Sequence, residues 1–165
     1  MRFYTQAECE QWIRDRKRVT PNVANAKPSL RLRYPSSSAY LVYSWARTIA
    51  SSITFQGPCL LWITEWAIWS SSENLHLYYR LRQSYHDTRL ISEAPGHLFL
   101  GHETIDLASF LQIAMLNGWG GHVLTAADYV NAFFSHDEFI DFYSDNASMI
   151  DQLRIALTGD KLTGN

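Results

Sequence analysis

Pro58-Cys-Leu-Leu-Trp-Ile-Thr-Glu-Trp-Ala-Ile-Trp69 is the longest apolar stretch of the chain, and only Thr64 and Glu65 interrupt it. It follows the turn signal Gly57-Pro58. It is too short to span a bilayer, and a strand that is apolar on both faces requires cover on both faces. We therefore expect a central strand over residues 59–69, with four side chains deeply buried in the core: Leu60, Trp62, Trp66 and Ile68.

Helical and extended patterns alternate on both sides of this strand. Thr5-Gln-Ala-Glu8 has the capping-box spacing that opens a helix, here expected over residues 6–18. Residues 30–34 alternate between apolar and basic, as a half-exposed strand does. Apolar spacing predicts further helices over residues 39–53, 72–85 (behind a capping box at 70–73), 105–116 and 147–157, and short strands over residues 97–100 and 122–124.

Two more segments with capping-box spacing lie in the C-terminal half. Thr125-Ala-Ala-Asp128 and Ser135-His-Asp-Glu138 each place an acid three residues after a hydroxyl. At a helix start, such a pair satisfies two free backbone N–H groups. The pattern predicts two successive helices, or one helix kinked at Ser135.

The alternation predicts one mixed α+β domain over residues 1–165, in which helices pack around a single small sheet of about four strands. The chain is long enough to bury a core without disulfides. Its composition, 47% hydrophobic and 18% charged, excludes a disordered chain, and its six Trp indicate a Trp-rich core. Residues 160–165 follow Gly159 and are expected to fray.

The cysteine content and the N-terminal sequence indicate the compartment. Cys9 and Cys59 are far apart and form neither a metal-ligand pattern nor a redox pair, which suits a reducing environment. The segment from Met1 to Glu10 contains acids and no apolar run, so it lacks the pattern of a signal peptide. Because no apolar stretch has membrane length, we expect a cytoplasmic protein that does not enter a membrane.

Charge is distributed unevenly along the chain. Residues 1–47 contain nine Lys and Arg and three acids, whereas residues 48–165 contain five Lys and Arg and thirteen acids. Between Leu90 and Leu153 there are nine acids and no Lys or Arg. Unless the fold interleaves the two halves, the C-terminal half presents an acidic face that steers a basic partner toward it. The alternative is a set of ordinary amphipathic helices whose acids face water.

In the docking interpretation, binding runs through the acidic C-terminal half. Acids speed and orient the encounter with a basic protein, and aromatic rings anchor it once it is bound. The candidate contact residues combine both kinds of side chain: Asp137, Glu138, Asp141, Asp145, Phe134 and Phe139.

Glu65 is the best candidate for a catalytic acid. A carboxylate within so apolar a run must be paired, exposed at an edge, or raised in pKa. A small hydrolase or transferase could use Glu65 together with a histidine such as His97 or His122. An ion pair with Arg47 or another N-terminal arginine explains the same carboxylate without catalysis, and structural pairing is the commoner outcome.

No metal and no cofactor is expected. His102-Glu103 resembles the start of a zincin helix, but the fourth residue after His102 is Asp106, where a second histidine ligand is required. Glu103 and Asp106 are better explained as acids at a helix N-terminus, which the helix dipole favours. Cys59 opens an apolar strand, and a buried structural thiol is inert. No Gly-rich phosphate loop follows a predicted strand.

A nucleic-acid-binding module is the third hypothesis. The stretch from Arg14 to Arg33 contains seven Lys and Arg, and such a patch can follow a phosphate backbone. The whole chain has a net charge of −2, however, and contains neither a recognition-helix motif nor an RNA-platform motif. A solvated face, or a platform for the C-terminal acids of the same chain, explains the basic stretch better.

Three segments suggest a family: Trp69-Ser-Ser-Ser-Glu-Asn-Leu-His76, Glu93-Ala-Pro-Gly-His-Leu-Phe-Leu100, and Gly118-Trp-Gly-Gly121 through Ser135-His-Asp-Glu138. With them, the organisation of the chain resembles the small cytosolic immunity proteins that accompany bacterial polymorphic and contact-dependent toxins. Those proteins are compact, motif-poor, Trp-rich and often acidic, and they block a toxin by binding it. The resemblance covers most of the chain in overall organisation and carries over no family residue. It implies a non-enzymatic, immunity-type inhibitor of a basic bacterial toxin or nuclease, which is the leading hypothesis.

Overall fold

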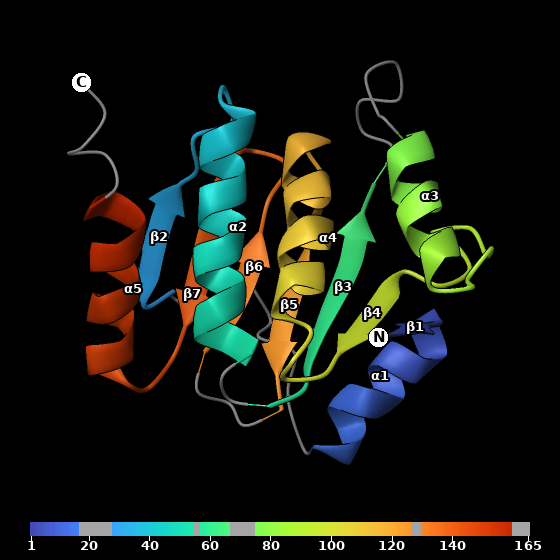
Figure 1. The fold of residues 1–165 in the computed structure, drawn as a ribbon. Helices are drawn as coiled ribbons and strands as arrows, with labels where there is room; N and C mark the ends of the chain where they lie inside the picture. The colour runs from blue at the N-terminus through green and yellow to red at the C-terminus, as the bar shows by residue number, and fades with distance from the viewer. Residues whose placement is uncertain (17–27, 55–56, 67–74, 127–129, 160–165) are drawn as a thin grey trace.

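The computed structural model describes residues 1–16, 28–54, 57–66, 75–126 and 130–159. Within these ranges the chain forms five helices and one antiparallel sheet of seven strands (Figure 1). The strands are β1 Arg2–Tyr4, β2 Leu30–Arg33, β3 Cys59–Glu65, β4 Gly96–Phe99, β5 Gly120–Thr125, β6 Asn131–Phe134 and β7 Phe139–Tyr143. The helices are α1 Gln6–Asp15, α2 Ala39–Thr54, α3 Leu75–Ser84, α4 Thr104–Leu116 and α5 Ala147–Gly159.

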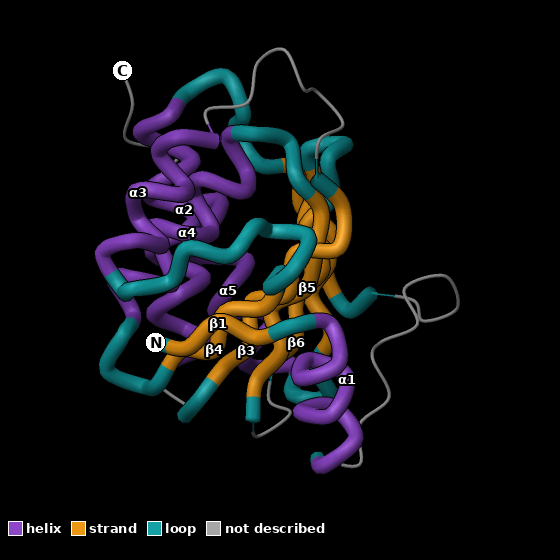
Figure 2. Tube along the Cα trace, turned by 90° about the vertical axis from the view of Figure 1, so that its right-hand side faces the viewer, coloured by secondary structure: helices purple, strands orange, loops and turns teal. Residues whose placement is uncertain are grey.

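The two faces of the sheet are covered differently. The strands lie in the order β1-β4-β3-β5-β6-β7-β2. Four helices, α2 to α5, lie on one face, and α1 lies alone on the other (Figure 2). We call the face that bears α1 the open face, because α1 packs only on the part formed by β1, β3, β4 and β5.

The predicted central strand is confirmed as β3. On the open face, Leu60 and Trp62 pack against α1 through Trp12. The alternate side chains of the strand, Leu61 and Ile63, belong to the larger core under the other helices. All four strand side chains are buried, so β3 has cover on both faces, as its doubly apolar sequence requires.

The start of α1 confirms the first capping box. The backbone N–H of Thr5 donates to the Glu8 carboxylate at 2.7 Å, and the N–H of Glu8 donates to the Thr5 hydroxyl at 3.3 Å. The predicted helices that correspond to α2, α4 and α5 are also present. No described helix is both long enough and apolar enough to cross a membrane.

The expectation of helices after Thr125 and Ser135 is wrong, because residues 131–134 and 139–143 form an antiparallel hairpin, β6 and β7. The second capping-box segment is its turn, in which Glu138 adopts a positive φ of 67°. The physical reason is that side chains of a strand alternate between its two faces: Ile140 and Phe142 belong to the helix-covered core, and Asp141 between them faces the other way.

Two further expectations need correction, and others fall outside the described residues. The sheet has seven strands instead of about four, because β1 and the hairpin were not predicted. Trp66 lies beyond the end of β3 and is only partly buried, so its predicted deep burial is wrong. Several predicted features lie outside the described residues: the end of the first helix at residues 17–18, Ile68, the capping box at 70–73 and the tail at 160–165.

Candidate functional site

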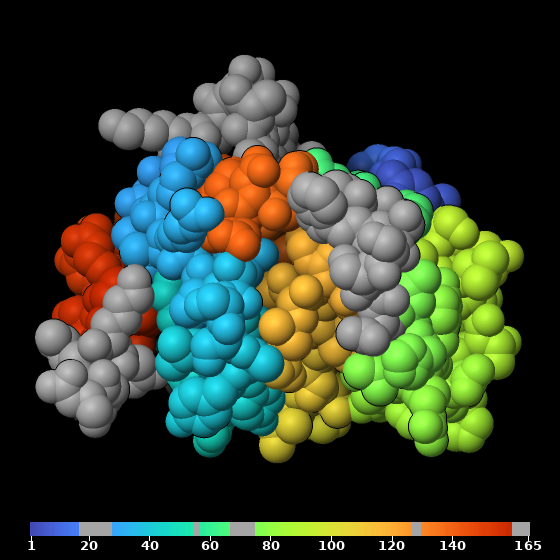
Figure 3. Space-filling model, turned by 90° about the horizontal axis from the view of Figure 1, so that it is seen from above, coloured from blue at the N-terminus to red at the C-terminus, as the bar shows by residue number. Residues whose placement is uncertain are grey.

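The turn between β6 and β7, residues 135–138, lies at the upper end of the molecule (Figure 3). It borders a groove of about 620 Å³, whose lining comes from segments 33–37, 115–118 and 136–138. These segments are far apart in sequence and meet because β2, α4 and the hairpin all end or turn here. The view from above shows them side by side, the hairpin in orange between β2 in blue and α4 in yellow.

Glu65 reaches this turn because of an irregularity in β3. The pairing with β5 shifts between Ile63, opposite Gly121, and Glu65, opposite Gly120. A bulge re-aims the side chain that follows it, and the missing Cβ of Gly120 leaves room for the carboxylate. Glu65 Oε2 lies 2.8 Å from Nδ1 of His136. Both side chains are partly exposed, so the carboxylate is paired and at the surface instead of isolated in the core.

His97 lies on the helix-covered face and is fully buried. Its Nδ1 lies 3.3 Å from the carbonyl oxygen of Leu61, and its Nε2 lies 2.8 Å from the hydroxyl of Tyr78. Because a carbonyl only accepts, Nδ1 carries the proton and Nε2 accepts from Tyr78. Burial, together with the charge of Arg82, lowers the pKa of His97 to about 3. His97 is therefore a neutral core residue.

His122 lies on the opposite, open face, beside Trp62 and Phe133. Burial lowers its pKa to about 4, although the negative charge of Glu65 acts in the other direction. The sheet thus separates His122 from His97, and the hydrogen bond of Glu65 goes to neither of them. Of the two histidines named as possible catalytic partners of Glu65, neither forms a hydrogen bond with it, and the histidine that does is His136.

Three of the six candidate contact residues gather at the turn. Asp137 is exposed, with Oδ1 3.5 Å from Nε2 of His136. Glu138 accepts a 2.8 Å hydrogen bond from Arg33, which lowers the pKa of the Glu138 carboxyl. Phe139 opens β7 next to them. We call the group of five residues around the turn the hairpin site: Glu65, His136, Asp137, Glu138 and Phe139.

The other three candidate contact residues lie elsewhere. Phe134 is buried in the core under the helices, and Asp141 is fully buried in the middle of β7. Asp145 is exposed, but it lies beyond the far end of β7 from the turn. The six residues therefore do not form a single patch, and any contact surface at the turn includes only Asp137, Glu138 and Phe139 of them.

The fold interleaves the basic and acidic halves of the chain. Strand β2 pairs with β7 and brings Arg31 to Asp141 and Arg33 to Glu138. Other acids in the C-terminal half also have local partners; Asp106 accepts from the hydroxyl of Tyr85, for example. The expected acidic face is thereby reduced to local groups, of which the hairpin site contains Asp137 and Glu138.

A row of rings crosses the open face. Ring centroids are 6.2 Å apart for Trp62 and His122, 5.2 Å for His122 and Phe133, and 6.1 Å for Phe133 and Phe139. The guanidinium of Arg31 lies 4.2 Å from the ring centre of Phe139. We call these five residues the aromatic row. The aromatic residues of 131–134 and 139–143, a type of residue that favours strands, are the sequence signal that could have indicated it.

A second group that the sequence did not reveal is a buried polar network centred on Arg82. Its guanidinium is fully buried and donates to the Tyr78 hydroxyl at 2.8 Å, to the Ala94 carbonyl at 3.1 Å and to the Asp87 carboxylate at 2.7 Å. Asp87 also accepts from Arg89 at 2.8 Å. These arginines hold the pKa of Asp87 below its usual value, against the effect of burial. The network ties α3 to the segment that follows it.

The described part of the chain contains no group of three or more His, Cys, Asp or Glu side chains that could hold a metal ion. Around His102, Glu103 accepts the backbone N–H of Leu100 at 2.7 Å and pairs with the N-terminal amine.

Comparison with known proteins finds no match among family models, curated proteins or solved structures. The hairpin site and the aromatic row are therefore the basis for a functional proposal.

Proposed function

We propose that the protein is a non-enzymatic protein-binding domain, an immunity-type inhibitor that acts in the cytoplasm on a basic bacterial toxin or nuclease. The observation that carries the proposal is the hairpin site, where the carboxylates of Asp137 and Glu138 line a groove at one end of the sheet and the ring of Phe139 follows them in the chain. Surfaces that combine charged groups with an aromatic anchor are typical of protein interfaces.

The charge of the hairpin site favours a basic partner. Glu65, Asp137 and Glu138 contribute three carboxylates around the turn, and Arg33 contributes one guanidinium. The three carboxylates thus outnumber the one guanidinium. Asp137 is the most exposed of the three acids, at 69% of its side chain. A Lys or Arg side chain of a partner can approach Asp137 without first displacing a lysine or arginine from the described part of this chain.

The apolar part of the site supplies the anchor. Leu116 lines the groove and is 44% exposed, whereas Met115 beside it is 2% exposed and offers almost no area to a partner. Phe139 is partly exposed and continues into the aromatic row. Side chains of this kind bury area when a partner docks, and aromatic residues and arginines are those that most often dominate binding energy.

The enzymatic alternative rests on the hydrogen bond between Glu65 and His136. In the serine and cysteine hydrolases, a histidine contacts a hydroxyl or thiol nucleophile and is oriented by a carboxylate. Within the described residues, His136 has side-chain hydrogen bonds or ion pairs only with Glu65 and Asp137. The pair is therefore more consistent with a charged binding surface than with a pair that activates a nucleophile.

The nucleic-acid alternative rests on the basic stretch. Of its seven cations, Arg31 and Arg33 are occupied by Asp141 and Glu138, and the guanidinium of Arg16 lies 4.0 Å from the ring centre of Trp12. Lys17, Arg18 and Lys27 lie outside the described residues. A surface whose arginines are already paired releases few counterions on contact with phosphates, which weakens the case for this function.

The test begins with capture of the partner from the native host on the full chain, followed by its identification and purification. Association rates are then measured for the wild type, Asp137→Lys and the control Asp151→Lys. Asp151 is exposed to 64% and lies on α5, so the control makes the same charge change away from the hairpin site. We expect Asp137→Lys to slow association several-fold at low salt, and the two variants to converge as salt screens the charges.

The inhibitor part of the proposal has its own readout. The captured protein should lose its toxic or nucleolytic activity when the wild-type chain is added in equal amount. The proposal fails if the captured protein keeps its activity in the complex. It also fails if Asp137→Lys and Asp151→Lys associate at the wild-type rate at low salt.

A further inference from the structure

The groove beside the hairpin site already holds a guanidinium, that of Arg33. Its Nη2 donates at 2.8 Å to Oε2 of Glu138, and both side chains line the groove. Arg33 lies opposite Phe139 in the pairing of β2 with β7, so the strand register places it next to the turn. Figure 3 shows β2 and the hairpin side by side from above. The chain itself therefore shows which kind of group the Glu138 carboxylate binds.

The pair of Arg33 and Glu138 is placed where it can come apart. The side chain of Arg33 is 78% exposed and that of Glu138 is 38% exposed. Exposed ion pairs contribute little to stability, because water solvates the separated charges well. Hydrogen bonds from Arg33 and Ser36 lower the pKa of the Glu138 carboxyl, so this group is ionised at neutral pH. Removing Arg33 from the carboxylate costs the fold little and leaves a charged acceptor.

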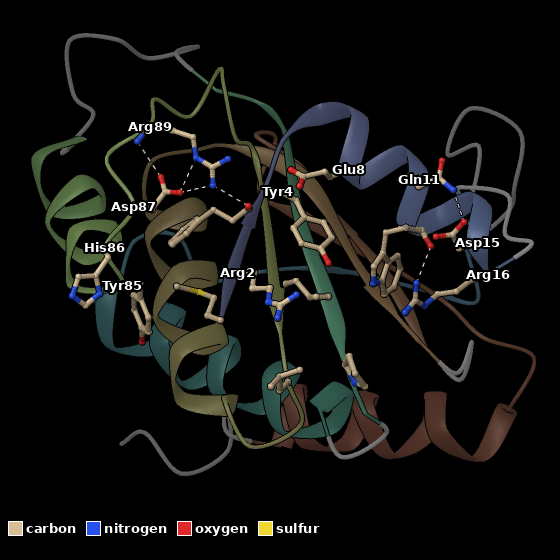
Figure 4. Close-up of a pocket in the computed structure, with 16 residues that line it drawn as sticks. Arg2, Tyr4, Glu8, Gln11, Asp15, Arg16, Tyr85, His86, Asp87 and Arg89 are labelled. Atoms are coloured by element: carbon tan, nitrogen blue, oxygen red, sulfur yellow. Dashed lines mark hydrogen bonds and ion pairs between the residues drawn. The ribbon is translucent and has the colours of Figure 1, made fainter.

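An arginine at the opposite edge of the sheet shows the contrast with a fixed ion pair. Figure 4 shows Arg89 and Asp87 in contact beside a second groove, of about 640 Å³, along β1. Asp87 is buried and also accepts from the buried Arg82. Arg89 donates a further hydrogen bond, at 3.0 Å, to the carbonyl of Phe3 in β1. Arg89 thus ties two segments together, whereas the guanidinium of Arg33 has a single acceptor among the described residues.

The rest of the groove at the hairpin site favours a cation. Asp137 lines it and is exposed. Helix α4 ends at Leu116 in the groove wall, and the C-terminal end of a helix carries a partial negative charge. The last turn of α4 contains no basic residue that would neutralise this charge. Among the described residues that line the groove, Arg33 is the only Lys or Arg.

We propose that Arg33 is an autoinhibitory occupant of the hairpin site, and that docking replaces it on Glu138 with an arginine of the basic partner. The incoming guanidinium reaches the exposed Asp137 first and then takes the acceptor that Arg33 gives up, while Arg33 moves into water. One guanidinium replaces another, so no charge is left buried without a partner. Arginine suits the exchange better than lysine, because a planar guanidinium donates two parallel hydrogen bonds to a carboxylate. The inference rests on the proposed function, which supplies the basic partner.

The test measures how tightly a fluorescently labelled peptide of six arginines binds to the full chain at low salt, by fluorescence anisotropy. Arg33→Gln removes the occupant and should lower the dissociation constant about threefold or more. Arg14→Gln is the matched control, because Arg14 is 61% exposed and pairs with Glu10 on α1, outside the groove. It makes the same change in net charge and should alter the dissociation constant by less than about 1.5-fold. A peptide of six lysines should bind more weakly than the arginine peptide.

Glu138→Gln separates displacement from general repulsion between Arg33 and the peptide. In that background Arg33 has no carboxylate to occupy, so adding Arg33→Gln should tighten binding much less than it does in the wild type. Each variant is first shown to be folded by circular dichroism. The proposal is overturned if Arg33→Gln binds the arginine peptide no tighter than Arg14→Gln does. It is also overturned if the gain is equal in both backgrounds, or if the lysine peptide binds as tightly.

No partner protein enters this test, so its outcome is separate from that of the capture experiment. Tighter binding by Arg33→Gln, together with a captured protein that keeps its activity, rejects the inhibitor and keeps the displacement. A captured protein that is inhibited, together with an Arg33→Gln variant that gains nothing, rejects the displacement alone.

Discussion

The buried carboxylate of Asp141 in β7 accepts two hydrogen bonds from the guanidinium of Arg31 in β2, at 2.6 Å to Nε and 2.7 Å to Nη2. This fork joins the N-terminal and C-terminal halves of the chain, which the sequence shows to be oppositely charged. It also holds the guanidinium over the ring of Phe139, at one end of the aromatic row. The strand pairing therefore removes from the surface an acid that the sequence alone places in a docking face.

Breaking this fork should destabilise the fold. Arg31→Leu leaves the buried Asp141 without its cation, which is costly in a low-dielectric interior. The double variant Arg31→Leu/Asp141→Leu removes both charges and should recover part of the lost free energy of unfolding. Arg33→Leu, which breaks the more exposed pair with Glu138, serves as the control and should have a much smaller effect. The free energies of unfolding of the wild type and the three variants are measured with urea. A double variant that is no more stable than Arg31→Leu would contradict this account.

The two tryptophans of the β3 region should differ in their contribution to stability. Trp62 is 8% exposed and packs between the sheet and α1, so Trp62→Ala should lower the free energy of unfolding by about 3–5 kcal/mol. Trp66 lies past the strand and is only partly buried, so Trp66→Ala should cost less, about 1–2 kcal/mol. Equal losses of unfolding free energy in the two variants would contradict the assignment of Trp66 to a position beyond the end of β3.

Stability should fall as the pH drops below 6.5. The pKa values of His97 and His122 are lowered to about 3 and about 4, whereas a histidine in the unfolded chain titrates near 6.5. Between those values the unfolded state binds more protons than the folded state, so acid favours unfolding. Each residue contributes up to about 1.4 kcal/mol per pH unit.

The measurement is urea unfolding between pH 7 and pH 5, above the range in which most carboxylates titrate. His122→Phe keeps a ring between Trp62 and Phe133 and removes one of the two titrating groups. The pH dependence of its free energy of unfolding should be clearly weaker than that of the wild type. An unchanged slope in this variant would contradict the desolvated, neutral state assigned to the partly buried His122.

Both thiols should be unreactive in the folded protein. Cys9 and Cys59 are fully buried, and burial raises the pKa of each to about 12, helped in Cys9 by the charges of Glu8 and Glu10. The thiolate is the reactive form, and it is nearly absent at pH 8. A thiol reagent should therefore modify neither cysteine in buffer and both in denaturant. Rapid modification of one equivalent in buffer would contradict this burial.

The elements with strong local signals were predictable from the sequence. The capping box at Thr5 marked the start of α1, and the doubly apolar run marked β3. In α4, apolar spacing predicted residues 105–116, and the helix runs from Thr104 to Leu116, followed by Gly118 with a positive φ of 61°. In each case local preference and tertiary packing agree, which is why the pattern sufficed.

The hairpin shows where the pattern is ambiguous. Ser135-His-Asp-Glu138 has the spacing of a helix cap, but in the structure the Ser135 hydroxyl accepts from the N–H of Asp137 within a strand turn. Ser and Asp form such local bonds in turns as readily as at helix starts. The aromatic residues on both sides of the turn, a type that favours strands, were the better signal. The pairing of Glu65 with His136 could not be predicted, because it depends on the bulge in β3.

The proposal that the hairpin site is the docking surface has a direct test in site-specific cross-linking. Because the native thiols are buried, a cysteine introduced as Asp137→Cys or, for control, as Asp151→Cys can be labelled alone with a photoactivated cross-linker. Each labelled full-length chain is mixed with lysate of the native host and irradiated, and covalent products are identified by mass spectrometry. We expect the label at residue 137 to capture one basic protein in high yield and the label at residue 151 to capture little of it. Capture of that protein from residue 151 and not from residue 137 would place the docking surface elsewhere and contradict the central claim.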